Sequence, residues 1–286
     1  MRRLLLHRMP ALNNIARLPW IKGNIRKLEK GGSLWEPSRL FDNGEEGAWY
    51  DPSDLSTMFQ DGSGTTPVTA DGQPVGKILD KSGRGNHASQ ATAAARPILQ
   101  TDGTYWWLQF DGVDDALSTG SIDFSATSAM LVCSGGLVVG GLRVLSELGP
   151  TVTSSVGSYG IICNDNGAGN FRVTSNGGNG NGGYNTGDAG LGTKFVLAAQ
   201  YNFTNVDNTS VPVLNINGAA TAKALYGTLN PGSGPYGTWP LYLGSRAGIS
   251  LPLNGNIYSL IVRGALSSPA EIAQTEAWVN SKTGAY

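Results

Sequence analysis

Residues 105–115 read YWWLQFDGVDD, and this stretch sets the expectation for the fold. Its first six residues are aromatic or aliphatic apart from one glutamine, which is a composition typical of β-strands. The next five residues, DGVDD, are rich in glycine and aspartate, the residue types that favour tight turns. A strand closed by such a turn predicts a domain built from many short β-strands.

Similar apolar runs follow along the chain. They are residues 129–141, 158–165, 170–176, 194–203, 211–218, 239–246 and 254–265. Short strands separated by turn residues are typical of a β-sandwich or a jelly roll. Residues 175–192, SNGGNGNGGYNTGDAGLG, contain too much Gly and Asn to predict a packed strand, so we expect a surface loop there.

One helix is predicted near the end of the sequence, from Pro269 to about Lys282. Ser268 is a good N-cap, Pro269 suits the first helical position, and Glu271 completes a capping box. Gly284 provides a stop signal. We expect this helix to lie against the sandwich.

The composition agrees with a large all-β domain. The 286 residues include 41 Gly and 14 Pro, and only 14% are charged. Residues 47–61, GAWYDPSDLSTMFQD, combine turn chemistry with the apolar anchors Trp49, Tyr50, Leu55 and Phe59, and we interpret them as an edge of the domain. We therefore predict an N-terminal arm over residues 1–45 and a single β-sandwich over 46–286.

Charge is divided unequally between these two parts. The first 40 residues hold nine Lys or Arg and two acids, a net charge of +7, whereas the remainder holds eleven against nineteen, a net charge of −8. This asymmetry predicts that the arm anchors to another subunit or to an acidic surface; a flexible tail, or an arm packed on the sandwich, remains the alternative. The basic residues expected to anchor it are Arg2, Arg3, Arg8, Arg17, Lys22, Arg26 and Lys27.

Several other classes of function are disfavoured. The apolar run Leu4–Leu6 is too short for a secretory signal, and no run approaches the roughly 20 residues that cross a bilayer. The arm has few aromatic residues among its basic ones, so we expect no nucleic-acid partner. Cys133 and Cys163 lie in apolar runs and are interpreted as core thiols, with a disulfide as the alternative.

Catalytic patterns are missing as well. A retaining glycan hydrolase needs two carboxylates about 5 Å apart, and Glu147 stands alone in its strand-like run. The two histidines are His7 in the arm and His87 in a Gly-rich turn, where we expect the imidazole to cap backbone groups. We therefore expect a protein that is not an enzyme.

Glycan binding would use aromatic side chains beside Gly, Asn and Pro. Tyr184, Tyr226, Tyr236 and Trp239 occupy such positions and are the predicted ligand-binding residues. Isolated aromatic residues in sandwiches more often belong to the core, so that interpretation stays open for each of them.

Three segments together resemble the laminin-G-like family of concanavalin-A-like jelly rolls. They are Asp80–His87, DKSGRGNH; Leu108–Asp115, LQFDGVDD; and Gly255–Val262, GNIYSLIV, with the capped helix that follows. The resemblance covers about residues 75–284 and implies a β-sandwich jelly roll. It also implies calcium as a candidate ion, with Asp111, Asp114 and Asp115 as ligands, because family members often hold calcium through loop carboxylates.

Residues 47–61 look like a segment that precedes such domains in structural proteins of tailed bacteriophages. That resemblance implies a virion structural protein, a decoration, collar or tail-fibre component on the head, collar or tail surface. In this hypothesis the arm binds other virion proteins, the chain forms a homo-oligomer and the sandwich faces outward. The alternative is a carbohydrate-binding module for host surface glycan, and a glycan hydrolase is the remote alternative.

Overall fold

The computed structural model describes residues 35–150, 156–163, 169–176, 182–187, 192–203, 211, 213–227 and 234–286. The chain divides into two compact units, Met1–Glu36 and Pro37–Tyr286. Residues 37–45, expected in the arm, belong to this second unit. The predicted anchoring residues Arg2 to Lys27 lie outside the described residues.

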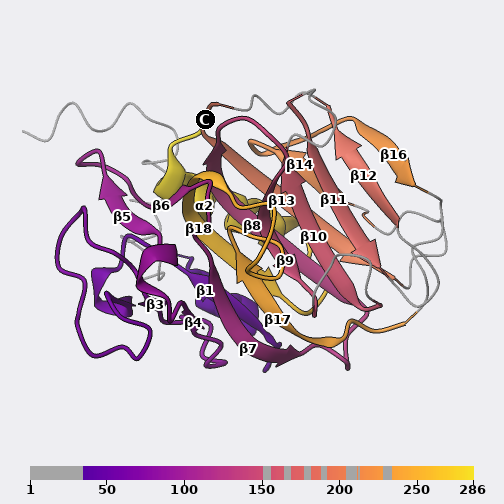
Figure 1. Cartoon of the computed structure of the whole chain (residues 1–286). Helices are drawn as coiled ribbons and strands as arrows, with labels where there is room; N and C mark the ends of the chain where they lie inside the picture. The colour runs from indigo at the N-terminus through magenta and orange to yellow at the C-terminus, as the bar shows by residue number, and fades with distance from the viewer. Residues whose placement is uncertain are drawn as a thin grey trace, which may run out of the picture. The chain divides into compact units, whose positions relative to one another are not determined.

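The second unit is a sandwich of two antiparallel sheets (Figure 1). The eight-stranded sheet contains, in spatial order, β15 (Ala219–Ala220), β14 (Val213–Ile216), β13 (Phe195–Asn202), β8 (Ala129–Val138), β18 (Asn254–Arg263), β6 (Trp106–Asp111) and β5 (Ile98–Thr101), and β1 (Gly47–Tyr50) also pairs with β18. These strands and those of the second sheet confirm the predicted all-β class.

The ten-stranded sheet forms the other layer. Its spatial order is β16 (Lys223–Gly227), β12 (Gly182–Thr186), β11 (Phe171–Asn176), β10 (Ser158–Cys163), β9 (Arg143–Leu148), β17 (Thr238–Leu243), β7 (Leu117–Asp123), β4 (Ala88–Ser89), β3 (Lys77–Ile78) and β2 (Met58–Phe59). Three short 3₁₀ helices, η2 (Pro37–Phe41), η3 (Leu55–Thr57) and η4 (Ala93–Ala95), complete the described elements beside one α-helix.

Aromatic pairs join the two sheets across the core. The ring centroids of Phe171 on β11 and Phe195 on β13 lie 4.5 Å apart, and those of Tyr159 on β10 and Tyr201 on β13 lie 5.8 Å apart. Successive residues of a strand point to opposite faces, so these pairs also establish which residues of β10 and β11 face outward. Odd-numbered residues of both strands face the core, and even-numbered residues face away from it.

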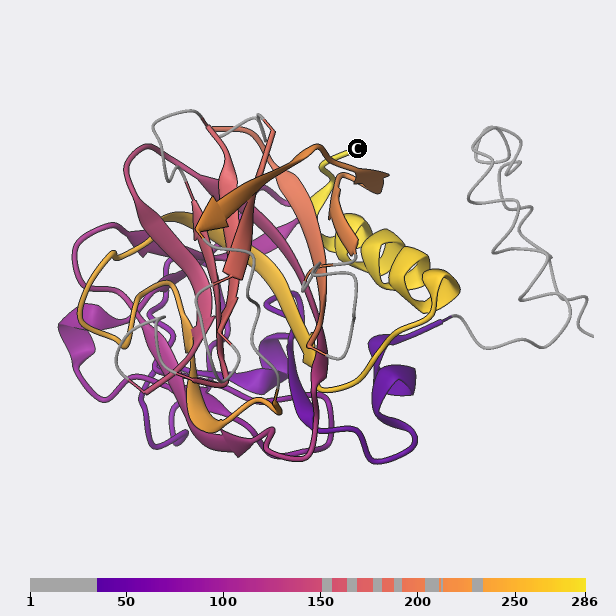
Figure 2. The same cartoon turned by 90° about the vertical axis from the view of Figure 1, so that its right-hand side faces the viewer.

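Helix α2 (Pro269–Thr283) packs on the outer face of the eight-stranded sheet, against β8, β13 and β18 (Figure 2). Both hydrogen bonds of the predicted capping box form between Ser268 and Glu271, and Gly284 ends the helix in the left-handed conformation. A Cβ at Gly135 on β8 would lie 1.9 Å from Oγ1 of Thr283, so this glycine permits the close approach of helix and sheet. No helix in the described ranges is long and apolar enough to span a membrane.

The predicted strands are all present, usually shortened by one to three residues at an end. The prediction of a loop throughout residues 175–192 is wrong in part, because residues 182–186 form β12 between β11 and β16. A strand whose neighbours supply its backbone hydrogen bonds tolerates the Gly-rich composition that misled the prediction. Cys133 and Cys163 are buried free thiols, as predicted.

The Asp80 carboxylate organises the Gly-rich turn and ties it to β1. Its oxygens accept hydrogen bonds from the backbone N–H groups of Trp49, Ser82 and Asn86 and from the Ser82 hydroxyl, at 2.7–3.0 Å. The backbone N–H of Asp80 donates to Nδ1 of His87 at 3.0 Å, which confirms the predicted capping role of this imidazole. The resemblance segment 80–87 is thus a structural turn.

We predict that Asp80→Asn destabilises the fold by about 2–4 kcal/mol. The amide replaces one acceptor oxygen with a donor and removes the charge, so backbone N–H groups that the carboxylate satisfies lose their partners. Urea unfolding of both proteins measures the difference. An unfolding free energy within about 0.5 kcal/mol of wild type would show that the turn does not depend on this carboxylate.

Candidate functional site

Two of the predicted ligand-binding aromatics lie on the core side of the sandwich. Tyr236 is 1% exposed, and its ring centroid lies 4.6 Å from that of Phe203. Trp239 on β17 packs against the core, and its indole N–H donates to the carbonyl of Val156 at 3.1 Å. Both side chains contribute to packing, and their predicted contact with a ligand stays a prediction.

The other two aromatics lie on adjacent strands but on opposite faces. Tyr184 on β12 belongs to the core and is 8% exposed. Tyr226 on β16 pairs with Gly183, one residue away from Tyr184, so its ring faces outward. The guanidinium carbon of Arg172 on β11 lies 4.2 Å from the centre of the Tyr226 ring, a cation–π contact. Of the four predicted aromatics, Tyr226 is the one at the outer face.

A continuous row of paired residues crosses the outer face of the ten-stranded sheet. Its members are directly opposite one another on β17, β9, β10, β11, β12 and β16, in the order Tyr242, Glu147, Gly160, Thr174, Gly183 and Tyr226. A half-buried tyrosine therefore stands at each end of the row, with two glycines, a threonine and a carboxyl group between them. Arg172 and Asn185 form the next pair on the same face.

This face carries buried polar groups with unused hydrogen-bonding capacity. Five of its side-chain atoms have no hydrogen-bond partner within the described part of the chain: Oε1 of Glu147, Oδ1 of Asn170, Asn176 and Asn185, and Nη2 of Arg246. The glutamate and the three asparagines are all more than nine-tenths buried. Buried polar groups in folded proteins are nearly always hydrogen-bonded, so each of these exceptions calls for a partner such as water or a ligand.

Glu147 and Arg246 form the charged part of the face. Nε of Arg246, in the loop that follows β17, lies 3.1 Å from Oε2 of Glu147. The carboxyl group is fully buried, and this burial raises its pKa to about 7, against the opposing effect of Arg246. The ion pair therefore holds a carboxyl group that titrates near neutral pH.

Two β-bulges help to place this pair. The register of β9 and β10 shifts between Ile161 and Ile162, and that of β17 and β7 shifts between Pro240 and Tyr242. Bulges change which face a side chain meets and are frequent beside functional sites. The sequence indicated that Glu147 was isolated, but it contained no signal for the pairing with a loop arginine 99 residues later.

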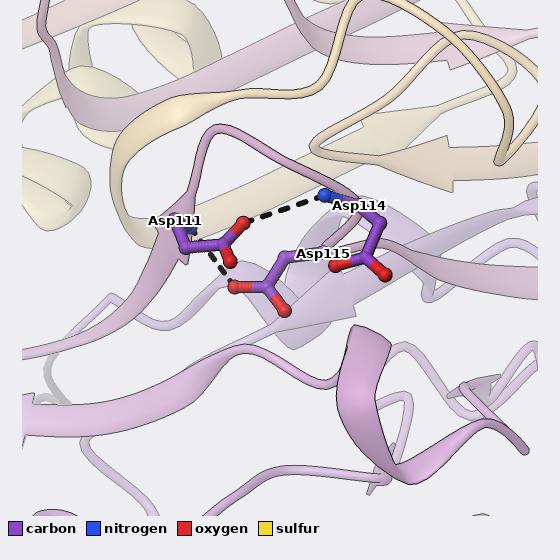
Figure 3. A group of neighbouring side chains, drawn as sticks. All are labelled: Asp111, Asp114 and Asp115. Carbon is purple, nitrogen blue, oxygen red and sulfur yellow. Dashed lines mark hydrogen bonds between the residues drawn. The ribbon is translucent and has the colours of Figure 1, made fainter.

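The acidic turn between β6 of the eight-stranded sheet and β7 of the ten-stranded sheet is a separate cluster. Asp111, Asp114 and Asp115 each place one carboxylate oxygen within 4.8 Å of the others (Figure 3). Asp111 Oδ1 accepts from the backbone N–H of Val113 at 2.8 Å, and Asp115 Oδ2 accepts from that of Asp111 at 2.9 Å. These hydrogen bonds account for the turn itself.

Carboxylate oxygens of this kind suit Ca²⁺, so the three side chains have the right chemistry for the predicted ion. Burial and the neighbouring charges of Asp111 and Asp114 raise the pKa of Asp115 to about 6. A cation bound here would relieve that repulsion. Calcium binding at this turn stays a prediction.

The search of solved structures identifies similar folds. Trypanosoma rangeli sialidase, in complex with 2,3-difluoro-KDN, has a TM-score of 0.50 and 13% identity over 86% of this chain and 33% of its own. A second structure of that sialidase has the same TM-score and identity over 90% and 38%. The ligand-binding domain of botulinum neurotoxin serotype D, in complex with N-acetylneuraminic acid, has a TM-score of 0.49 and 11% identity over 70% and 48%.

The chain spans about a third to a half of the length of these structures. At 13% identity the sialidases share a fold with this chain, which agrees with the β-sandwich described above. No family model matches the sequence, and no curated protein matches it.

We predict that Asp115→Asn removes a pH dependence from the stability of the fold. The folded-state pKa of Asp115 exceeds its unfolded value of about 3.9, so the folded state binds the proton more tightly. The unfolding free energy of wild type should therefore fall by about 1–2 kcal/mol as pH rises from about 4 to about 6, and the variant should lack this component. Urea unfolding across this range, without added calcium, gives the difference; superimposable profiles would contradict the prediction.

Proposed function

We propose that this protein is a carbohydrate-binding β-sandwich domain that binds glycan on the outer face of its ten-stranded sheet. The observation that carries the proposal is the set of buried polar atoms on this face that have no hydrogen-bond partner among the residues that the structure describes. Sugars are dense in hydroxyl groups that both donate and accept hydrogen bonds, and carboxylate, amide and guanidinium groups supply the complementary atoms.

The aromatic ends of the row support the same class of ligand. Ligand sites typically combine apolar or aromatic surfaces with a few fixed polar groups. Tyr226 lies at one end of the row, which includes two glycines, and its ring is in cation–π contact with Arg172. The shared fold with a sialidase that is found in complex with a sugar derivative agrees with this proposal, without indicating where a sugar would bind.

We infer binding without turnover. The ion-pair partner of Glu147 is Arg246, whereas retaining hydrolysis requires a second carboxylate about 5 Å away. Release of reducing sugar from any glycan that the protein binds would contradict this inference.

A second candidate is the virion structural role, in which the glycan-binding sandwich would be displayed on a phage particle. It is favoured by the charge difference between the arm and the sandwich and by the resemblance of residues 47–61, both of which are features of the sequence alone. The two candidates are compatible, because an adhesin on a virion binds host glycan. Localising the chain in purified particles would separate a virion component from a free lectin.

The binding proposal predicts that Tyr226→Ala weakens glycan binding by about fivefold or more, because the ring loses its contact area with the ligand. Wild type is first screened on an array of bacterial and animal glycans, and the affinity of the best neutral and acidic hits is then measured by calorimetry. Tyr105→Ala is the matched control, because Tyr105 is also half-buried and also lies 4.2 Å from a cation, Lys194, beside the other sheet.

Equal losses in the two variants would indicate a general effect of removing a tyrosine. A wild-type protein that binds no glycan on the array, at a concentration where it is folded, would contradict the proposed function itself.

A further inference from the structure

Glu147 and Arg246 contact each other through a single hydrogen bond. The ion pair uses Nε and Oε2, while Nη2 and Oε1 have no hydrogen-bond partner in the described residues. A guanidinium group and a carboxylate often meet through two parallel hydrogen bonds. Here the second hydrogen bond is not made. The donor Nη2 and the acceptor Oε1 nevertheless lie close together, because the first hydrogen bond already holds the two groups in contact.

We propose that this buried donor–acceptor pair, which lacks its second hydrogen bond, is the hydroxyl-recognition subsite of the domain and that it takes the vicinal diol of an uncharged sugar. The inference rests on the proposed function and names the residues and the ligand class for it. One sugar hydroxyl accepts a hydrogen bond from Nη2 of Arg246. The same hydroxyl, or the adjacent hydroxyl on the sugar ring, donates a hydrogen bond to Oε1 of Glu147. A hydroxyl does both at once, which neither a carboxylate nor an ammonium group can do.

The surroundings of the pair fit a neutral ligand. Tyr242 pairs with Glu147 on the adjacent strand, is half-buried, and has a hydroxyl group that interacts electrostatically with the Glu147 carboxyl group. The Glu147 carboxylate is fully buried, and a second negative charge placed against it would be repelled at low dielectric. An acidic sugar would therefore have to turn its carboxylate away from this subsite.

The charge state of Glu147 provides a second signature. Besides Arg246, the titratable groups that interact with Glu147 are the hydroxyls of Tyr242 on β17 and Tyr159 on β10, and the pKa of each is raised. The raised pKa values keep both tyrosines neutral near pH 7, whereas the Glu147 carboxyl group, with a pKa of about 7, titrates there. A ligand that donates to the carboxylate binds the ionised form more tightly, and its affinity falls as pH drops below 7.

The experiment compares Glu147→Gln with Glu276→Gln. Glu276 on α2 is a matched control, because it is also a buried acid, 4% exposed, with one oxygen that has no partner among the described residues, but it lies under the helix on the other sheet. The probes are methyl α-mannopyranoside, methyl β-galactopyranoside and methyl α-glucopyranoside, with the methyl glycoside of N-acetylneuraminic acid as the acidic comparison. Calorimetry or ligand-observed NMR gives each Kd from pH 5.5 to 8.5.

We expect wild type and Glu276→Gln to bind at least one neutral glycoside equally well. Glu147→Gln should raise that Kd about tenfold to a hundredfold at pH 8, because a hydrogen bond to a charged group is lost, and should abolish the weakening at low pH. Arg246→Gln should raise the Kd similarly. Because Arg246 is the more exposed member of the ion pair, this variant still tests the subsite if Glu147→Gln fails to fold.

Three outcomes overturn the inference. The pair would be structural if Glu147→Gln or Arg246→Gln bound the neutral glycoside as tightly as wild type. If Tyr226→Ala still lost binding in that case, the proposed function would survive with a different subsite. A preference for the acidic glycoside that Glu147→Gln leaves unchanged would contradict the ligand class. Absence of binding to every glycan, on the array and in solution, would overturn the proposed function and this inference together.

Discussion

The packing of the two sheets on one shared aromatic core is the constraint on which the rest of this structure depends. Phe171 meets Phe195, and Tyr159 meets Tyr201, across the interface between the layers. Because side chains alternate along a strand, the residues directly before and after each of these anchors in its strand must face outward. Core packing on β10 and β11 thus determines that Gly160, Arg172 and Thr174 lie on the outer face of the ten-stranded sheet.

The two outer faces have different chemistry. The eight-stranded sheet is covered by α2, and a glycine on β8 lets the helix approach closely. The ten-stranded sheet instead carries a buried ion pair and three asparagines whose carbonyl oxygens have no partner in the described ranges. Polar groups that are buried without partners cost stability, and ligand binding is the role that we propose for those on this face.

The fold was more accessible from the sequence than the site. Apolar runs closed by Gly, Asn or Asp located β8, β13 and β18, and the Ser268 capping box located α2, because each is a local pattern. β12 was missed because its strand character comes from its neighbours β11 and β16. The burial of Tyr236 was not accessible from the sequence, because a Gly- and Pro-rich setting does not reveal whether a side chain joins the core.

The candidate site was missed for a similar reason. Glu147 and Arg246 are far apart in the sequence, and a bulge on each side of the pair alters the alternation from which a face is predicted. The three carboxylates of the acidic turn, by contrast, lie close together as expected for neighbours in the chain, and their binding of calcium stays a prediction.

The most direct measurement is a crystal structure of the protein with the glycan that it binds most tightly. The account predicts a sugar ring on the outer face of the ten-stranded sheet, with one hydroxyl within hydrogen-bond distance of both Glu147 and Arg246. A sugar bound instead at the acidic turn, or under helix α2, with water between Glu147 and Arg246, would contradict it.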